Sequence, residues 1–230
     1  MSLSEKDIET YMENELKPED TFRFDCKMCG SCCRCRSEPI VLTGVDIYRI
    51  ARALDMPMSH VVESNTLGCI GSTSHMPVLV LRERLDGSCR LLRKGRCMVQ
   101  QDKPVVCALF PLGRFYSYGD QKFHYFMNQK ACQSGRKDGK EWTLQAWLDE
   151  FRIVETEEMT RAWNRLIGGL SMITKDIAPD KIKGRILDVI LPALYLDYRT
   201  DEPYIEQVER HMILLKDVFK HEFHRNLTFD

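Results

Sequence analysis

Five of the ten cysteines of this 230-residue chain lie within ten residues, in the segment C-K-M-C-G-S-C-C-R-C from Cys26 to Cys35. Cys26, Cys29 and Cys32 are each separated by two residues. A Cys-x-x-Cys turn lets two thiolates converge on one metal ion, with Zn–S bonds of about 2.3 Å, or hold two irons of a cluster. Gly30 can supply the positive φ that such a turn needs beneath the sulfur atoms. The segment therefore predicts a metal site.

Two further features of the cysteines leave alternatives open. Cys32 and Cys33 are adjacent, and adjacent cysteines tend to point apart, so they rarely bind one metal ion together. This favours a cluster, two neighbouring sites, or one thiol that binds nothing. Cys69 stands alone in a segment rich in glycine and serine, which we expect to be a loop, and a lone cysteine there is more often an incidental thiol than a ligand.

The composition limits the classes of protein that need to be considered. The length suffices for one substantial core, or for one domain with a smaller companion. A formal net charge of −1 gives no general reason to expect a nucleic-acid partner. No apolar run approaches the roughly 18 residues of a membrane span, and the first ten residues do not resemble a signal peptide. We therefore expect a cytoplasmic protein without a membrane partner, whose cysteines bind metal rather than form disulfides.

The hydrophobic pattern predicts an α+β fold, with small antiparallel hairpins that carry the cysteines and a mostly helical C-terminal half. One hairpin is expected to join residues 77–85 to 89–92 through the turn Asp86-Gly87, and a second to surround Gly119-Asp120. A short buried strand is expected at residues 40–42. The expected helices are one begun by the N-cap Thr43 with Asp46 in its first turn and stopped by Pro57, and others over residues 59–64, 142–153, 155–175, 181–196 with an interruption at Pro192, and 205–219.

These elements suggest three segments. Residues 1–21 form an acidic helical arm, with Ile8, Met12 and Leu16 at helical spacing. Residues 22–150 form a cysteine-cluster metal-binding domain. Residues 151–230 contain no cysteine and form a helical cap or bundle, which offers a surface for a protein partner.

Several motifs occur in an order that resembles the CxxCxxCC, or YkgJ-type, cysteine-cluster family. The first knuckle, C-x-x-C-G-x-C-C, is followed by T-x-x-D-I-x-R-I-A from Thr43. D-G-x-C then ends at Cys89, and P-x-x-C-x-x-F-P begins at Pro104. Lys103 stands where the family typically has arginine, which keeps the charge but loses bidentate recognition of an anion. The resemblance covers roughly residues 22–150.

The resemblance implies metal binding, because the family is described as zinc- or iron-chelating. Related cysteine motifs occur in a flagellin lysine methylase, where they are associated with an iron–sulfur cluster. Eight thiolates would fill two four-cysteine sites, or one cluster and a structural pair. Cys35 and Cys69 lie outside the family pattern. The implied ligands are Cys26, Cys29, Cys32, Cys33, Cys89, Cys97, Cys107 and Cys132.

The identity of the metal and the use of the site have several candidate answers. The close spacing of the cysteines in the first knuckle favours an iron–sulfur cluster of the 4Fe-4S kind. Such a cluster would serve electron transfer, redox sensing or a modifying enzyme. The wide separation of the later cysteines is typical of zinc sites. A structural zinc site would make the protein an interaction module. A third possibility is a metalloenzyme with its site between the cysteine half and the helical cap.

An enzyme would also need acid or base groups near its metal. His60, His75, His124 and Asp86 are the candidates, although a histidine in an aromatic strand, such as His124, is more often a packed strand residue. His221 and His224 share a helix face but are better explained as a solvated helix end. The basic segment 82–96 is similarly better explained as a solvated hairpin than as a nucleic-acid surface. Whether the protein is an enzyme stays open.

Overall fold

The computed structural model describes residues 14–34, 39–71, 75–117, 119–128, 133–177 and 179–229. Helices and small antiparallel sheets alternate along these residues, which confirms the predicted mixed α+β class. The chain folds as two compact units, each made of two segments. Unit 1 consists of Met1–Cys32 and Val105–Val154, and unit 2 of Cys33–Pro104 and Glu155–Asp230. The three segments inferred from the sequence stay a prediction.

The first helix of unit 2 begins where the sequence predicts. Thr43 is the N-cap of α2 (Gly44–Leu54), and its hydroxyl accepts a hydrogen bond from the backbone N–H of Asp46 at 3.1 Å. The Asp46 carboxylate in turn accepts from the backbone N–H of Thr43 at 2.8 Å, which completes a capping box. Asp55 ends the helix in the left-handed conformation, and α3 (Met58–Asn65) follows Pro57. Both predicted helices are confirmed.

The sheet of unit 2 differs from the prediction. Its strands β2 (Val41–Leu42), β4 (Pro77–Leu81) and β3 (Thr66–Ile70) lie in the order β2-β4-β3, and both pairs are antiparallel. The predicted hairpin over residues 77–92 is wrong, because β4 pairs with β2 and β3, and only a single bridge joins Glu83 to Cys89. The predicted loop around Cys69 is also wrong, since Cys69 lies in β3 opposite Val78. Burial of the alternating apolar residues of β4 against the core determines which strands β4 pairs with. The turn at Asp86-Gly87 joins only the residues close to it.

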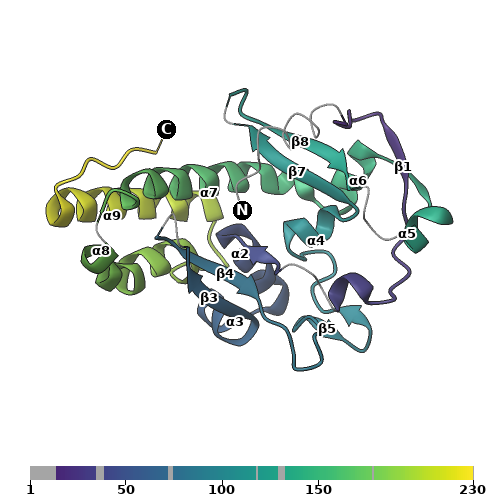
Figure 1. Cartoon of the computed structure of the whole chain (residues 1–230), viewed down its shortest axis with the longest axis horizontal. Helices are drawn as coiled ribbons and strands as arrows, with labels where there is room; N and C mark the ends of the chain where they lie inside the picture. The colour runs from purple at the N-terminus through teal and green to yellow at the C-terminus, as the bar shows by residue number, and fades with distance from the viewer. Residues whose placement is uncertain are drawn as a thin grey trace. The chain divides into compact units, whose positions relative to one another are not determined.

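The C-terminal half of unit 2 is helical, as predicted. Figure 1 shows its two long helices, α7 (Ile153–Thr174) and α9 (Tyr204–Phe223), running alongside each other. In the sequence between these two helices, α8 (Pro179–Arg185) continues into the π-helical turns η2 (Ile186–Ile190) and η3 (Pro192–Leu196). Pro192 has no backbone N–H, so an α-helical ladder cannot continue through it. The backbone N–H of Asp197 instead bonds the carbonyl of Pro192, five residues earlier, at 3.0 Å.

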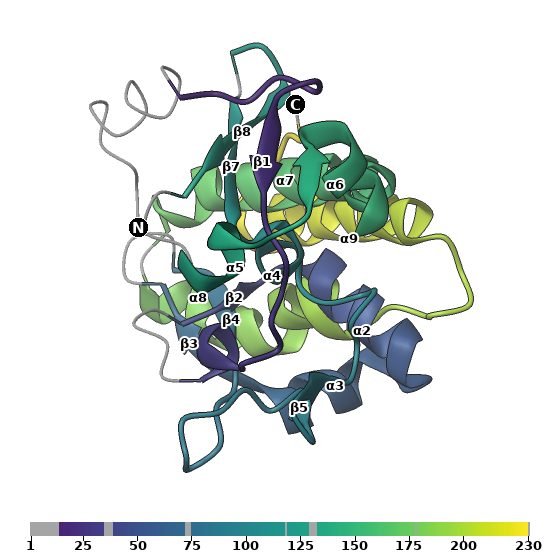
Figure 2. The same cartoon turned by 90° about the vertical axis from the view of Figure 1, so that its right-hand side faces the viewer.

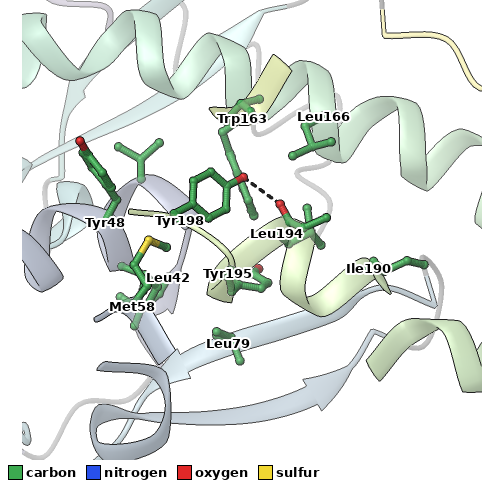
Figure 3. Packing of buried hydrophobic residues seen from close by; sticks show 14 of the residues in the cluster. Leu42, Tyr48, Met58, Leu79, Trp163, Leu166, Ile190, Leu194, Tyr195 and Tyr198 are labelled. Atoms are coloured by element: carbon green, nitrogen blue, oxygen red, sulfur yellow. Dashed lines mark hydrogen bonds between the residues drawn. The ribbon is translucent and has the colours of Figure 1, made fainter. Parts of the chain in front are cut away.

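The core of unit 2 joins its helices to its sheet (Figure 3). Trp163 of α7 lies against Tyr195 of η3, with ring centroids 5.2 Å apart, and Leu42 and Leu79 contribute from the strands. The Tyr198 hydroxyl donates to the carbonyl of Ala193 at 2.8 Å, so a buried polar group keeps a partner. Burial raises the pKa of Tyr198 far above its ordinary value, because a phenolate would lose its hydration there.

One buried histidine makes the stability of unit 2 depend on pH. His211 of α9 packs edge-on against Tyr198 at 4.7 Å, and its Nε2 lies 3.7 Å from an Asp197 carboxylate oxygen. Burial lowers the pKa of His211 below its ordinary value of 6.5, an effect that the nearby Arg210 adds to and Asp197 partly opposes. In the pH range just below 6.5 the unfolded chain therefore binds more protons than the folded chain, so folding stability decreases as the pH falls through that range.

We expect His211→Gln to remove this part of the acid dependence. Urea unfolding of the variant and of the unmodified chain should be compared at pH 7.5 and at about pH 5.5, on either side of the ordinary histidine value. The matched control is His221→Gln, which replaces an exposed histidine on the same helix. An unchanged acid dependence in His211→Gln would refute the assignment.

Unit 1 is built around two antiparallel strand pairs. The hairpin of β7 (Leu112–Ser117) and β8 (Lys122–Met127) forms as predicted, in register from Leu112 opposite Met127 to Ser117 opposite Lys122. Far apart in sequence, β1 (Thr21–Arg23) pairs with β9 (Glu141–Thr143), so the predicted helix from Trp142 begins only at Leu144. The helices of unit 1 are α4 (Val105–Leu109), α5 (Gln133–Lys137) and α6 (Leu144–Glu150), all visible in Figure 2.

A compact aromatic group fixes the strand that leads to the first cysteines. Phe22 and Phe24 both contact Trp147 edge-to-face, with ring centroids 5.6 and 5.7 Å away. The Trp147 indole N–H donates to the carbonyl of Leu109 at 3.2 Å, and that of Trp142 donates to the carbonyl of Phe24 at 3.1 Å. Residues 14–20 are not helical. Most of the predicted N-terminal helix, with Ile8 and Met12, lies outside the described residues.

Candidate metal centre

The first cysteine segment forms a sharp knuckle at the end of the aromatic group of unit 1. Met28 and Gly30 both have left-handed backbones, with φ of 49° and 76°. The positive φ predicted for Gly30 is thus confirmed, and Gly30 itself is buried. A short 3-10 turn, η1 (Ser31–Cys33), follows directly. The thiols of Cys26, Cys29 and Cys32 are exposed on this knuckle.

Helix α5 and the residues that follow it support the start of the knuckle. The backbone N–H of Asp25 donates to the carbonyl of Gly135 at 2.9 Å, and that of Phe24 donates to the carbonyl of Lys140 at 3.0 Å. A Cβ on Gly139 would lie 2.6 Å from the backbone of Phe24, closer than real Cβ contacts come. Glycine is therefore required for this approach. Cys132 lies outside the described residues.

Ser31 favours the metal-binding form of Cys29. Cys29 Sγ lies 3.3 Å from Ser31 Oγ. Hydrogen bonds from the hydroxyl and the backbone N–H of Ser31 lower the pKa of Cys29, although desolvation and the neighbouring Cys32 oppose the effect. The thiolate is the form in which cysteine binds metals. The knuckle therefore presents a thiol that loses its proton more easily than an ordinary cysteine.

The D-G-x-C motif of unit 2 is a closed turn that places Cys89 beside Cys33. One Asp86 carboxylate oxygen accepts from the backbone N–H of Ser88 at 3.0 Å and from its hydroxyl at 2.6 Å. These bonds lower the pKa of Asp86, and Gly87 turns the chain with a φ of 74°. The backbone N–H of Cys89 then donates to the carbonyl of Cys33 at 2.7 Å. Asp86, considered above as an acid or base, serves this turn.

Arg84 holds the same turn, a role that the sequence motifs do not indicate. Its guanidinium donates to three backbone carbonyls, those of Cys89 at 2.8 Å, Arg90 at 2.8 Å and Leu92 at 2.6 Å. The chain then continues into the hairpin of β5 (Leu92–Arg93) and β6 (Arg96–Cys97), joined by Lys94 and Gly95. Both turn residues have positive φ, the pattern of a type I′ turn. Cys97 thereby lies opposite Leu92.

We expect Arg84→Gln to lower the free energy of unfolding by about 2 kcal/mol. The substitution removes the charged guanidinium and leaves three backbone carbonyls without their hydrogen-bond donor. Metal content should fall with it, since Cys89 loses its fixed place. The matched control is Arg90→Gln, which removes the same charge from an exposed side chain of the same turn. Urea unfolding and metal analysis of the two variants provide the comparison, and equal effects would contradict a specific role for Arg84.

Arg49 fixes the segment that leads to Cys107. It is buried, and it donates to the carbonyls of Gln101 at 3.1 Å and Lys103 at 3.3 Å. Its Nε also lies 3.9 Å from an Asp102 carboxylate oxygen. In the T-x-x-D-I-x-R-I-A motif the threonine and aspartate thus cap α2, and the arginine holds the backbone just before Pro104. The motif is structural in every one of these contacts.

The candidate ligands fall into two groups within the described residues. Unit 1 contains Cys26, Cys29, Cys32 and the half-buried Cys107, while unit 2 contains Cys33, Cys89 and Cys97. No three His, Cys, Asp or Glu side chains of the described ranges lie close enough together to hold a metal ion. The donor chemistry fits zinc or iron, and binding at such a site would be coupled to local ordering of its ligands.

The histidines considered above do not join either cysteine group. His124 is buried, with Nδ1 2.7 Å from Glu15 and Nε2 3.0 Å from Asp120, and it stacks on Phe115. It is therefore packed in its strand, as expected. His60, His221 and His224 are exposed, and His224 ends α9.

Together these observations define an α+β protein that presents two groups of cysteines on tight turns. Residues 25–133 match the model of the CxxCxxCC family, described as "Putative zinc- or iron-chelating domain". The match confirms the resemblance stated above; it includes all ten cysteines and slightly less than half of the chain. A search of curated proteins and one of solved structures gave no match. Among the helices of the described ranges, none has the length and apolar composition to cross a membrane.

Proposed function

We propose that this chain is a metal-binding protein whose pattern cysteines hold an iron–sulfur cluster. The observation that supports this most directly is the knuckle of unit 1, where left-handed residues at Met28 and Gly30 expose three thiols within seven residues. The lowered pKa of Cys29 favours the thiolate that iron and sulfide require. When bound, such a cluster supplies one-electron chemistry, with a potential set by its hydrogen bonds and exposure.

The exposure of the knuckle suggests how the cluster is used. A cluster ligated by exposed cysteines lies near solvent, where an electron partner or an oxidant can reach it. We therefore assign the protein to electron transfer, redox sensing or support of a modifying enzyme. We place it in the cytoplasm, because a reducing compartment keeps its many thiols available for metal.

The test is metal and acid-labile sulfide analysis of protein purified without oxygen, together with its visible spectrum. Iron with a similar amount of sulfide, and absorbance near about 400 nm that is lost in air, is the expected result. Zinc without sulfide would refute the iron–sulfur proposal. Protein without either metal would refute metal binding as a whole.

A structural zinc site is the second candidate, and one observation favours it. Cys89 is buried in the core of unit 2, where Cys33 and Cys97 pack against the same core. Cysteines that lie on a turn and a small hairpin and pack in a core are typical of structural zinc sites. In that case a chelator should unfold the chain, since metal binding then contributes to folding itself. A colourless protein that stays folded after chelation would refute this candidate.

A further inference from the structure

Unit 1 has an open pocket that the metal proposal does not use. Its volume is about 770 Å³. The strand β1, the end of β8 and the helix α5 line it, together with Leu16 of the segment before β1. Sites for small organic ligands typically measure about 300–1,000 Å³, so the pocket has the capacity for one.

The rim of this pocket is positively charged. Arg23, Arg136 and Lys137 line it, and no Asp or Glu is among its lining residues. Glu141 is 3.9 Å from Arg23, but both side chains are more than half exposed, so the pair neutralises little. Within the described part of the chain, no carboxylate forms an ion pair with Arg136 or Lys137. Cations gathered on one concave surface attract an anion.

The floor of the pocket is apolar. Leu16 and Met127 line it with half-buried side chains, whereas the ring of Phe22 is buried against Trp147. Methionine adapts its shape to an apolar or aromatic group and makes favourable contacts with rings. An inorganic ion would use only the rim. A ligand with both a charged head and an apolar body would use the rim and the floor together.

We propose that this pocket binds a small organic anion, with a carboxylate or phosphate head at Arg23, Arg136 and Lys137 and an apolar body over Leu16 and Met127. The site uses none of the proposed metal ligands and adds a ligand-binding role to the proposed function. Arginine favours such heads, because its guanidinium donates two parallel hydrogen bonds to carboxylate or phosphate oxygens.

The test is calorimetric titration of the full chain with phenyl phosphate and with 4-phenylbutyrate, which distinguish the two head groups. Inorganic phosphate lacks the apolar body, and benzylamine reverses the charge of the head. We expect at least one of the two organic anions to bind, more tightly than both of these controls. Binding should weaken as salt is added, because exposed charges are screened.

Substitutions connect the binding to the pocket. The double variant Arg136→Gln/Lys137→Gln should bind the preferred anion about tenfold more weakly or worse, since it loses two charged donors. Lys122→Gln, an exposed cation on β8 outside the lining, is the control and should bind normally. Met127→Gln should weaken binding of the organic anion and leave that of inorganic phosphate unchanged. Circular dichroism and metal content of each variant identify any loss of fold or of metal.

Four outcomes would overturn the proposal. They are failure of both organic anions to bind, equal affinity for inorganic phosphate, an equal loss in Lys122→Gln, and binding that appears only after removal of residues 1–13. The last would assign the pocket to the chain's own acidic segment, which contains Glu5, Asp7, Glu9 and Glu13. Since metal content is measured on the same samples, failure here is distinguishable from failure of the metal proposal.

Discussion

Protein with Cys29→Ser should retain less than about one tenth of the iron and acid-labile sulfide of the unmodified chain when both are purified without oxygen. Serine keeps the size of the side chain, but its hydroxyl is a poor ligand for zinc and for iron–sulfur clusters, which select thiolates. Cys29 is central to the knuckle and has the thiol whose pKa Ser31 lowers. Iron, zinc and sulfide analysis per chain measures the loss.

The control for this experiment is Cys69→Ser. Cys69 is an exposed thiol in β3 and lies outside the family pattern, so its replacement should leave the metal content unchanged. Full metal content in Cys29→Ser would refute the knuckle as a ligand site. An equal loss in both variants would show that metal content reports general damage to the protein.

Cys89→Ser extends the same measurement to the second cysteine group. If the chain binds a single metal centre through both groups, Cys29→Ser and Cys89→Ser should each remove all of the metal. If it binds two centres, each variant should lose the metal of its own centre and keep that of the other, and the retained metal should differ in sulfide content when only one centre is an iron–sulfur cluster. Retention of all metal in Cys89→Ser would exclude Cys89 as a ligand.

Gly44→Ala should destabilise the protein by about 3 kcal/mol, which corresponds to a fall in Tm of roughly 6–12 °C for a domain of this size. Gly44 is the first residue of α2, and a Cβ there would lie 2.6 Å from the Trp163 ring, 2.7 Å from the carbonyl oxygen of Leu194 and 2.7 Å from the Tyr204 hydroxyl. Trp163 and Leu194 both belong to the close-packed core in Figure 3, and the contact with a backbone oxygen cannot be relieved by a rotamer change.

Gly184→Ala is the matched control. Gly184 lies in α8, and a Cβ there would meet no atom within 4 Å. Alanine is favoured over glycine in a helix, so this variant should be more stable by about 0.5–1 kcal/mol. Thermal and urea unfolding of the two variants should give shifts of opposite sign. A loss of less than about 1 kcal/mol in Gly44→Ala would show that the helix start can move away from the core.

The sequence by itself determined the features that depend on a few neighbouring residues. The capping box of Thr43 and Asp46, the left-handed Gly30 in the knuckle, and the hairpin around Gly119-Asp120 all form as predicted. Each depends on groups that are close in the sequence, such as Thr43 and Asp46 in the cap and Ser117 opposite Lys122 where the hairpin closes, so the residue types alone specify the hydrogen bonds or the backbone angles. The family resemblance also came from short motifs, and the match over residues 25–133 confirms it.

Tertiary structure decided the partners of β4, the strand that contains Cys69, and the roles of Arg84 and Arg49. The acceptors for both arginines are backbone carbonyls, which every residue carries, so nothing in the sequence marks the carbonyls of Cys89 or Gln101 as their targets. Strand pairing likewise depends on which apolar faces the core can bury together, because each strand could pair with several others on local grounds alone. The cysteines and their turns were therefore readable in the sequence, whereas the contacts that hold those turns in place could be read only from the folded chain.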